Sequence, residues 1–364
     1  MERREFLKAA VGGVCGMALA SWRAQLALAE PIKTLLGESL PAAGPIVSIQ
    51  RFAQETEAAK AVEAALKLIG GIDKVIKSGE VVVIKLNIVN AEGGRWIGRV
   101  TNSGVMEGVI KAVIDCGATP IVAEGTCEEK FGDTTGFAKE LGLLKICKRY
   151  GAKFVDLNTD HVVVNRVPQP LLWSQFHIAR QVMECDKFIS VPVMKLHQAA
   201  GVTLGMKNLV GVCSPKQYRT SSKYSRGMLH MRERTLWRQR YGTLDGEGEI
   251  QQWNPLGATI ADLASTRPID LVVVDGIYGE ERNSPVGGGM VDIKQRSGSY
   301  LILAGTNTVA VDAIGAHIMR QQPKRLPQLR FASGKGLGIS DIKKIRVVGE
   351  RLEDVAVPMR SVIC

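Results

Sequence analysis

One short stretch near the middle of the chain, VPVMKLHQAAGVTLGMKNLVG, concentrates side chains that could do chemistry. Lys195 and His197 stand two residues apart where an apolar, strand-like run ends, so they project to the same side. Thr203 and Lys207 stand four apart and share one face if that segment is helical, with Asn208 beside them. Ammonium, imidazole, hydroxyl and amide groups together suit the binding of carboxylate or phosphate oxygens and the transfer of protons.

Each of these five residues also has an ordinary explanation when it is taken alone. A single Lys is usually a solvated surface residue, and a single His is usually a satisfied core or surface group. Glycines at positions 201 and 205 and a proline at position 192 shape the backbone around the whole set, however, and glycine lets a ligand approach the backbone closely. We therefore interpret the set as a binding site.

Three other apolar runs end in polar side chains. The run VVVI leads into Lys85 and Asn87, whose two-residue spacing again turns both to one side. The runs TPIVA and DLVVV lead into Glu124 and Asp275. Ligands of open parallel α/β sheets bind outside the carboxyl ends of the strands. If the four strands share one parallel sheet, all these side chains converge on one edge.

Carboxylates among these residues add acid, base or metal chemistry. Four side chains could hold one divalent cation or act as acid and base: Glu124, His197, Asp275 and Asp312. Asp312 lies in an apolar helical run, where a charge needs a partner, and a salt bridge to one of the lysines explains it as well as a metal does. No Ser-His-Asp arrangement can be inferred, since G-x-S-x-G does not occur.

The expected fold is α/β, a mostly parallel sheet flanked by helices, with a basic insertion. Runs such as VVVI are apolar throughout, as in strands that are covered on both faces. Strands are expected at residues 46–52, 81–84, 119–123, 153–157, 188–193, 270–274, 300–304 and 344–348. Helices are expected at residues 55–68, 102–116, 135–144 and 309–319 and near residues 260 and 326, while 161–173 is ambiguous. The dinucleotide and P-loop glycine patterns are absent.

The N-terminus reads as an export signal. Residues 3–8, RREFLK, closely resemble the twin-arginine motif, a weakly apolar run follows, and ALA at 27–29 precedes an expected cut. The alternative is an amphipathic helix that happens to carry two arginines. The apolar run is too short to span a bilayer, and no run of eighteen apolar residues occurs elsewhere. We expect a periplasmic or otherwise extracytoplasmic protein that does not span the membrane and that meets the twin-arginine translocation machinery.

The charge of the chain is concentrated in one segment. Of a net +11, residues 214–241 contribute most, with eight Lys or Arg against one acid and with interleaved aromatics. That mixture is typical of polyanion binding, but an exported protein seldom meets nucleic acid, so no nucleic-acid partner is expected. We interpret the segment as a mobile insertion or lid over the site; a polyanion patch, or a face for a membrane or partner, is the alternative. The expected organisation is a signal peptide (1–29), a linker (30–45), an α/β domain (46–213 and 252–364) and the basic insertion (214–251).

The cysteines give no local metal motif. The chain has seven, of which Cys15 leaves with the signal, and the other six contain no C-x-x-C pair. Neither a zinc ribbon nor a ferredoxin-type cluster can be drawn from that spacing. The cofactor stays unknown: a divalent metal could bind, whereas an iron–sulfur cluster is not expected. Export permits disulfides, but the sequence does not choose among the pairings.

These motifs together resemble the domain-of-unknown-function family 362. The family pattern is a strand followed by K-P-N, a Thr that opens a helix, V-P-x-x-K-x-H with G-V-T-x-x-x-K-N-x-x-G, then V-D-G and a helical V-D-A. The matching residues here are Lys85, Asn87, Thr101, Lys195, His197, Thr203, Lys207, Asn208, Asp275, Gly276 and Asp312. The resemblance covers most of residues 45–350. It departs at Leu86, where proline is usual, and in lacking the ferredoxin-type cysteines that many members carry.

We expect an exported enzyme that binds a small carboxylate or phosphate substrate at the carboxyl edge of the sheet, with an unknown reaction class. Lys85, Lys195 and His197 are the expected catalytic residues. The expected substrate-binding residues are Asn87, Lys207, Asn208, Thr203 and, through the resemblance, Thr101. Asp275 and Asp312 are expected to hold a metal or to orient the lysines. The alternative is a non-catalytic periplasmic binding or accessory protein for an anionic ligand or a redox partner.

Overall fold

A computed structural model of the chain describes residues 44–89, 97–127, 134–220, 226–230, 236, 254–282, 284 and 288–361. All of these residues except Gly44 belong to a unit that begins at Pro45. The predicted signal peptide and nearly all of the predicted linker lie outside the described residues, as does most of the basic insertion.

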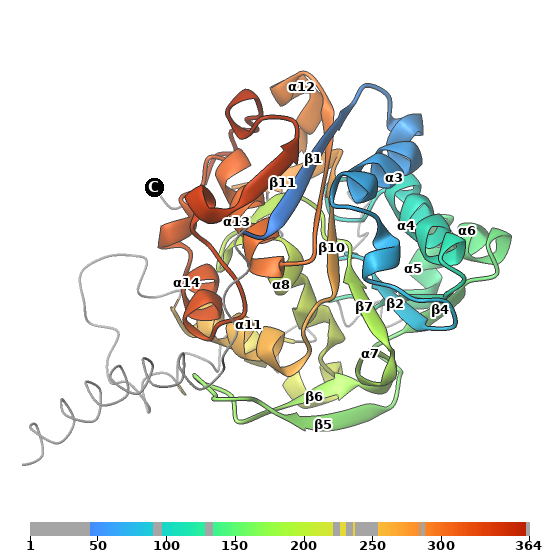
Figure 1. The fold of residues 1–364 in the computed structure, drawn as a ribbon. Helices are drawn as coiled ribbons and strands as arrows, with labels where there is room; N and C mark the ends of the chain where they lie inside the picture. Colours follow the sequence, from blue (N-terminus) through green and yellow to red (C-terminus); the bar gives the residue numbers. More distant parts are fainter. Residues whose placement is uncertain are drawn as a thin grey trace, which may run out of the picture. The chain divides into compact units, whose positions relative to one another are not determined.

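An eight-stranded sheet organises this unit (Figure 1), in the order β14-β1-β13-β10-β7-β2-β3-β4. Five neighbouring strands run parallel: β10 (Leu271–Gly276), β7 (Lys187–Ser190), β2 (Val81–Lys85), β3 (Thr119–Glu124) and β4 (Lys153–Asp156). β13 (Tyr300–Gly305) is antiparallel to β10 and to β1 (Ile46–Phe52), and β1 pairs in parallel with β14 (Arg346–Gly349). The predicted fold class is confirmed, and the four strands with polar ends share one parallel block.

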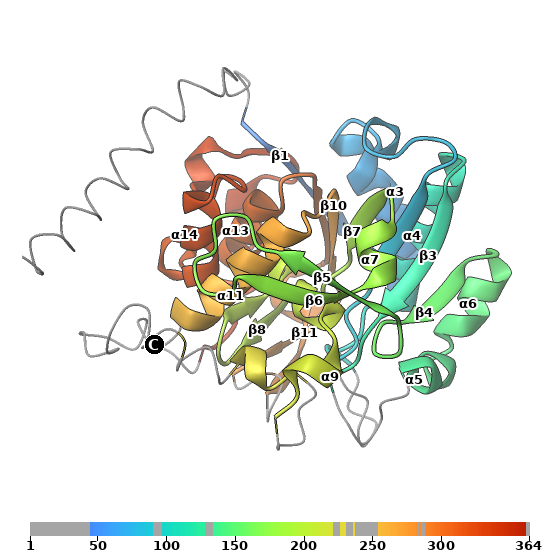
Figure 2. The same cartoon turned by 90° about the horizontal axis from the view of Figure 1, so that it is seen from below.

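Two apolar cores lie on the two faces of the sheet, because successive side chains of a strand point to opposite faces. In β10, Val272 and Val274 pack into one core, whereas Leu271 and Val273 pack into the other. Three helices cover the first face: α11 (Asn254–Thr266), α13 (Thr308–Ile318) and α14 (Pro327–Gly334). Two cover the second: α3 (Ala58–Leu68) and α4 (Ser103–Asp115) (Figure 2). This two-sided burial explains the unbroken apolar runs of the sequence.

Short elements complete the fold. Three pairs of strands stand outside the main sheet: β5 (Val162–Arg166) with β6 (Gln175–Ala179), β8 (Lys195–His197) with β9 (Gly201–Thr203), and β11 (Tyr278–Glu281) with β12 (Gly289–Asp292). The first pair resolves the ambiguous region 161–173. The remaining short helices are α5 (Thr134–Glu140), α6 (Leu143–Arg149), α7 (Arg180–Glu184), α8 (Gly205–Asn208), α9 (Pro215–Tyr218) and α12 (Ile293–Ser297). The single helix predicted at 135–144 is split, because Gly142 adopts a left-handed conformation (φ 74°).

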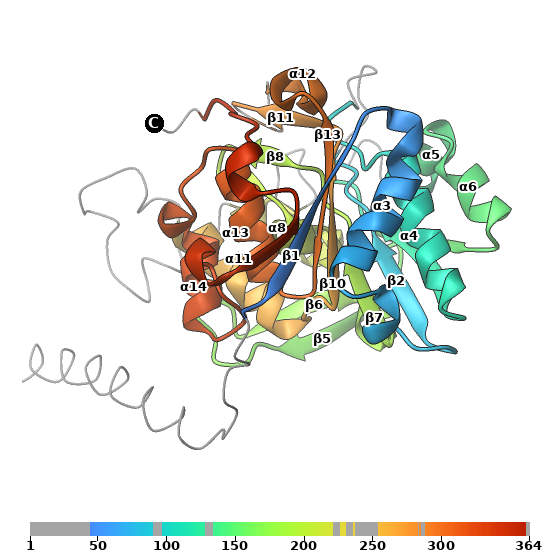
Figure 3. The same cartoon turned by 45° about the horizontal axis from the view of Figure 1, so that its top comes forward.

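β11 packs beside β8 near the carboxyl edge of the sheet (Figure 3). A Cβ atom at Gly279 of β11 would collide with the carbonyl oxygen of Met194, so only glycine allows this close approach. Within the part of the chain that the structure describes, no helix has the length and apolarity needed to cross a bilayer. Four cysteines of that part are free thiols: Cys116, Cys147, Cys185 and Cys213.

The contact between α3 and α4 gives a stability test. A Cβ atom at Gly108 of α4 would lie 2.8 Å from Val62 Cβ and 2.9 Å from Ala59 Cα. Alanine favours a helix over glycine by about 1 kcal/mol, but this overlap should outweigh that gain. We expect Gly108→Ala to lower the free energy of unfolding by about 1–3 kcal/mol in urea titrations.

The matched control is Gly334→Ala in α14, where a Cβ atom would meet nothing within 4 Å. This variant should keep or raise the unfolding free energy, because only the helix preference acts there. Equal stability changes in the two variants would contradict the close packing of α3 on α4.

Candidate functional site

A buried ion pair joins the carboxyl ends of two neighbouring strands. Lys85 ends β2 and Glu124 ends β3, and Lys85 Nζ lies 2.6 Å from Glu124 Oε1, with both side chains almost fully buried. Lys85 Nζ also donates to the carbonyl oxygen of Leu86 (2.8 Å) and to Asn208 Oδ1 (3.2 Å). The ammonium group has three protons, and these three acceptors take them. A direct role of Lys85 in catalysis, as predicted, would require one of these bonds to break.

The carboxylate of Glu124 is equally well satisfied. Its Oε2 accepts from the Ile88 backbone N–H (2.6 Å), and its Oε1 accepts from the Gly125 N–H (2.7 Å). Burial lowers the pKa of Lys85, and the charge of Glu124 opposes that shift. A Cβ atom at Gly211 would lie 2.8 Å from Lys85 Nζ. The pair therefore needs glycine at position 211, the last position of the central motif.

The hairpin β8–β9 presents the central polar residues on one face. Lys195 pairs opposite Thr203 and His197 pairs opposite Gly201, so Lys195, His197 and Thr203 point to the same side. The helix face that Thr203 and Lys207 were expected to share does not form, because Thr203 ends a strand and α8 begins at Gly205.

The carboxylate of Asp312 explains why α8 begins at Gly205. Its Oδ1 accepts from the Gly205 N–H (2.7 Å) and its Oδ2 from the Met206 N–H (3.0 Å), so a buried carboxylate from α13 satisfies the first N–H groups of α8. Burial raises the pKa of Asp312 to about 7, against these two hydrogen bonds.

Lys195 differs from Lys85 in its hydrogen bonds. Its side chain is 1% exposed, and among the described residues its Nζ atom makes no hydrogen bond. Burial lowers its pKa to about 8; the charge of Glu280 raises the value, whereas the charges of Lys207 and Arg99 lower it further. A buried donor without an acceptor costs free energy. The Nζ atom of Lys195 is therefore the group in this cluster that a ligand would satisfy.

His197 is held in one protonation state and one tautomer. Its Nδ1 accepts from the backbone N–H groups of Ala199 (3.0 Å) and Ala200 (3.1 Å). Burial, together with the charge of Lys207, keeps the pKa of His197 well below its ordinary value. A neutral ring with Nδ1 occupied as an acceptor carries its proton on Nε2. His197 is thus a hydrogen-bond donor at neutral pH.

Part of the basic segment lies against this site. The ring of His230 stacks on His197, with 5.8 Å between centroids and 23° between planes. Arg226, which is 4% exposed, joins the loop after β3 to the segment after α8. Its guanidinium donates to Cys213 O (2.7 Å), Thr126 O (3.0 Å), Gly211 O (3.0 Å), Gly125 O (3.3 Å) and Asn158 Oδ1 (2.6 Å). Sequence reasoning counted Arg226 and His230 only as part of a basic stretch.

Thr101 and Asn87 connect the loops behind these strand ends. Thr101 Oγ1 accepts from the Asn87 N–H (2.8 Å) and donates to Val191 O (2.8 Å), so its hydroxyl has a structural use. The Oδ1 atom of Asn87 is buried and, among the described residues, has no hydrogen-bond partner. Asn208 donates through Nδ2 to Ser190 Oγ (3.1 Å) and accepts from Lys85. Of the three, Asn87 has an oxygen left for a ligand.

Asp275 lies deeper than its position at a strand end suggested. Its Oδ2 accepts from the Asn102 N–H (2.7 Å) and its Oδ1 from the Ile277 N–H (3.0 Å). Burial raises its pKa to about 7, against these two bonds. Among the described residues, no three His, Cys, Asp or Glu side chains gather in a way that could hold a metal ion. Metal binding by Asp275 and Asp312 therefore stays a prediction. The described residues supply no third ligand for it.

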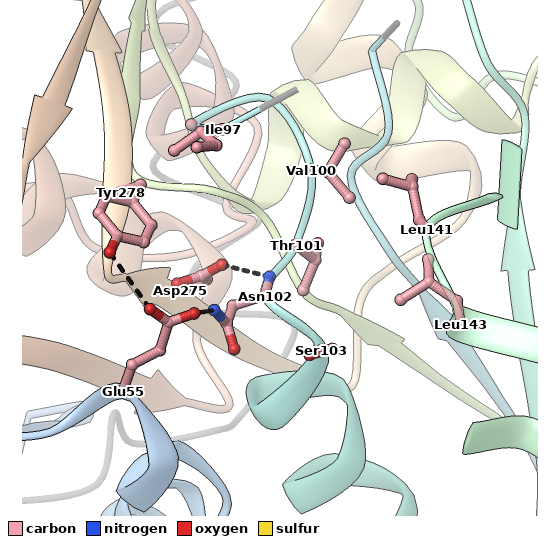
Figure 4. A pocket seen from close by; sticks show the side chains of 11 residues that line it. Glu55, Ile97, Val100, Thr101, Asn102, Ser103, Leu141, Leu143, Asp275 and Tyr278 are labelled. Carbon is pink, nitrogen blue, oxygen red and sulfur yellow. Dashed lines mark hydrogen bonds between the residues drawn. The ribbon is translucent and has the colours of Figure 1, made fainter. Parts of the chain in front are cut away.

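A cavity of about 250 Å³ opens beside Asp275 (Figure 4). One wall is polar, with Glu55 accepting from Asn102 Nδ2 (2.6 Å) and from the Tyr278 hydroxyl (3.2 Å). The lining also includes four apolar side chains: Ile97, Val100, Leu141 and Leu143. Leu141 and Leu143 lie across from Glu55 and Tyr278 in Figure 4. The cavity shares Thr101 and Asp275 with the predicted site, but its lining does not include Lys195 or His197.

The sequence was compared with family models and with known proteins. The model of the "Domain of unknown function (DUF362)" family matches residues 82–317, more than half of the chain. The chain belongs to the DUF362 family. A thylakoid-associated protein of Synechocystis sp. is 22% identical over 274 residues, which cover 75% of this chain and 73% of that protein.

Among solved structures, the lactate racemase apoprotein from Thermoanaerobacterium thermosaccharolyticum matches with a TM-score of 0.35 and 15% identity. The match covers 65% of this chain and 52% of the racemase chain, so it spans about half the length of that protein. A similarity at this level carries no argument about activity.

The DUF362 motifs and the structure rank the site residues differently. The motifs contain Lys85 and Lys195 alike and do not distinguish them. In the structure, three protein acceptors take the protons of Lys85 Nζ, whereas Lys195 Nζ has no hydrogen-bond partner among the described residues. Gly211 is the last residue of the motif. The sequence could not reveal that it lies against Lys85. Arg226 and His230 lie outside the motif. The one sequence signal for them is their position in residues 214–241, which are rich in Arg and aromatic residues.

The Lys85–Glu124 pair gives a second stability test. Glu124→Gln would leave a buried ammonium group without a charged partner, so we expect the free energy of unfolding to fall by about 3–5 kcal/mol. Glu107→Gln is the matched control, because Glu107 pairs with the exposed Arg149 at 3.2 Å. This control should cost less than about 1 kcal/mol. Urea unfolding of both variants measures the difference, and similar losses would show that the buried pair is not a special constraint.

Proposed function

We propose that the chain is an enzyme that binds a small carboxylate- or phosphate-bearing substrate, with Lys195 contacting the anionic group. The observation that carries this proposal is the buried Nζ atom of Lys195, which has no hydrogen-bond partner among the described residues. An anionic oxygen is the acceptor that best satisfies such a donor, because charge-assisted hydrogen bonds are the strong ones.

The surroundings of Lys195 support an anion. Lys207 and Arg99 both lower its pKa, which means that their positive charges act at the position of Nζ. Glu280 opposes them, but its Oε1 is engaged by Arg99 Nε at 2.6 Å and its Oε2 by the Ser284 hydroxyl at 2.7 Å. Because Arg99 and Glu280 pair with each other, the charge of Lys207 is the one that a bound anion would offset, and the anion would also remove the cost of the unpaired ammonium group of Lys195.

His197 has a narrower role in this proposal than proton transfer. Because its pKa lies well below its ordinary value, the ring is neutral at pH 7 and donates through Nε2. A fixed N–H donor stabilises oxygen charge that develops in a reaction. Proton transfer near neutral pH falls instead to Lys195, whose pKa of about 8 is close to working pH.

The test is calorimetric titration with malonate, which stays ionised above pH 7. Lys195→Met should weaken malonate binding at least about tenfold, the equivalent of ~1.4 kcal/mol. The native chain should bind malonate less tightly as the pH rises through about 8, because the ammonium group of Lys195 then loses its proton. Lys195→Met should lose this pH dependence.

Lys67→Met is the matched control, because Lys67 is exposed and pairs with Glu63 on the same helix. Unchanged malonate affinity in Lys195→Met would remove the assignment. A chain that saturates with one equivalent of every small acid offered, and converts none, would be a binding protein rather than an enzyme.

We also propose that the chain is exported in folded form through the twin-arginine route. The support is the RREFLK motif at residues 3–8 and the ALA sequence before Glu30. Replacing Arg3 and Arg4 together with Lys should keep the protein in the cytoplasm, whereas the native chain should appear outside it with Glu30 as its first residue. Arg23→Lys is the matched control. Cell fractionation with N-terminal sequencing measures both, and export of the double variant would contradict the proposal.

A further inference from the structure

We propose that Lys195 acts as a nucleophile that forms an imine with the carbonyl carbon of a 2-oxo acid. This inference rests on the anion site proposed above, and it narrows the substrate to a small acid with an aldehyde or ketone next to its carboxylate.

The contrast between two buried lysines carries the inference. Lys85 and Lys195 are both 1% exposed, but Lys85 donates all its protons to protein acceptors and Lys195 donates to none among the described residues. An amine tied into three hydrogen bonds cannot turn a lone pair toward a substrate. The amine of Lys195 has no such restraint, and the hairpin β8–β9 holds it beside His197 and opposite Thr203.

Burial favours the neutral form of Lys195. Burial has the largest effect and, with Lys207 and Arg99, brings its pKa to about 8, although Glu280 and Glu124 act in the other direction. A sizeable fraction of a lysine with this pKa is the free amine near neutral pH, as imine formation requires. Lysines desolvated in this way are the ones that form imines in proteins.

The same cluster supplies the other parts of the reaction. The positive charge of Lys207 would attract the carboxylate, and Nε2–H of His197 would donate to the carbonyl oxygen. The lone pair of Nζ forms the C–N bond while the carbonyl π electrons move to oxygen. The two amine protons then leave with that oxygen as water, and a C=N bond remains. No oxidant or reductant takes part.

The experiment traps the imine on the native, full-length chain. Glyoxylate is the probe, because it joins an aldehyde to a carboxylate, and sodium cyanoborohydride reduces the imine to a stable carboxymethyl amine. Peptide mapping by mass spectrometry then locates the adduct. At limiting glyoxylate and pH 7.5, we expect Lys195 to be modified about tenfold faster than the exposed Lys67, and its rate to rise with pH through about 8. Buried Lys85 should stay unmodified.

Malonate separates this inference from the proposed function. It has carboxylates but no aldehyde or ketone, so it should occupy the anion site and slow the labelling of Lys195 without slowing that of Lys67. Malonate binding with no adduct on Lys195 would overturn the imine and leave the anion site standing. No malonate binding would overturn the anion site itself. Labelling of Lys195 that malonate does not slow would also overturn the inference, because the amine would then react without the site.

Discussion

The buried pair of Lys85 and Glu124 is the constraint on which the site depends. Two opposite charges without water must satisfy each other and every remaining proton and lone pair, or the fold loses several kcal/mol. Here the backbone after β2, the backbone after β3 and Asn208 of α8 complete that requirement. The pair therefore holds the carboxyl ends of two strands and the last residue of α8 in one arrangement.

Neighbouring contacts depend on the same arrangement. Gly211 has to be glycine because the ammonium group of Lys85 occupies the space of a side chain, and the carbonyl oxygen of Gly211 then accepts from Arg226. Arg226 in turn holds residues 226–230 in place, which sets His230 on His197. A structural ion pair thus shapes the surroundings of the residues that we propose to be chemically active.

Lys85 and Lys195 both lie near the carboxyl edge of the sheet, but their hydrogen bonds differ. Both side chains lie in low-dielectric surroundings, and burial lowers both pKa values. Lys85 pairs with a carboxylate at 2.6 Å, whereas Nζ of Lys195 has no hydrogen-bond partner among the described residues and is affected by Lys207, Arg99, Glu280 and Glu124 only through their charges. The difference is one of partners rather than burial, and partners come from segments far apart in the chain.

The sequence by itself determined the fold class and the general location of the site. Unbroken apolar runs required strands buried on both faces, and the polar residues that end them had to meet at one edge once the strands ran parallel. Local periodicity also placed α4 and α13 correctly, because the helical spacing and the caps at Asn102 and Asn307 lie within each segment.

Only the tertiary structure decided what each polar residue does. Thr203 became part of a strand because Asp312, more than a hundred residues away, starts the next helix at Gly205. Other contacts between distant segments saturated Lys85 through Glu124 and Asn208, and among the described residues none supplied a hydrogen-bond partner to Nζ of Lys195. Hydrogen bonds and burial depend on distances between segments, and residue spacing along a chain does not contain those distances.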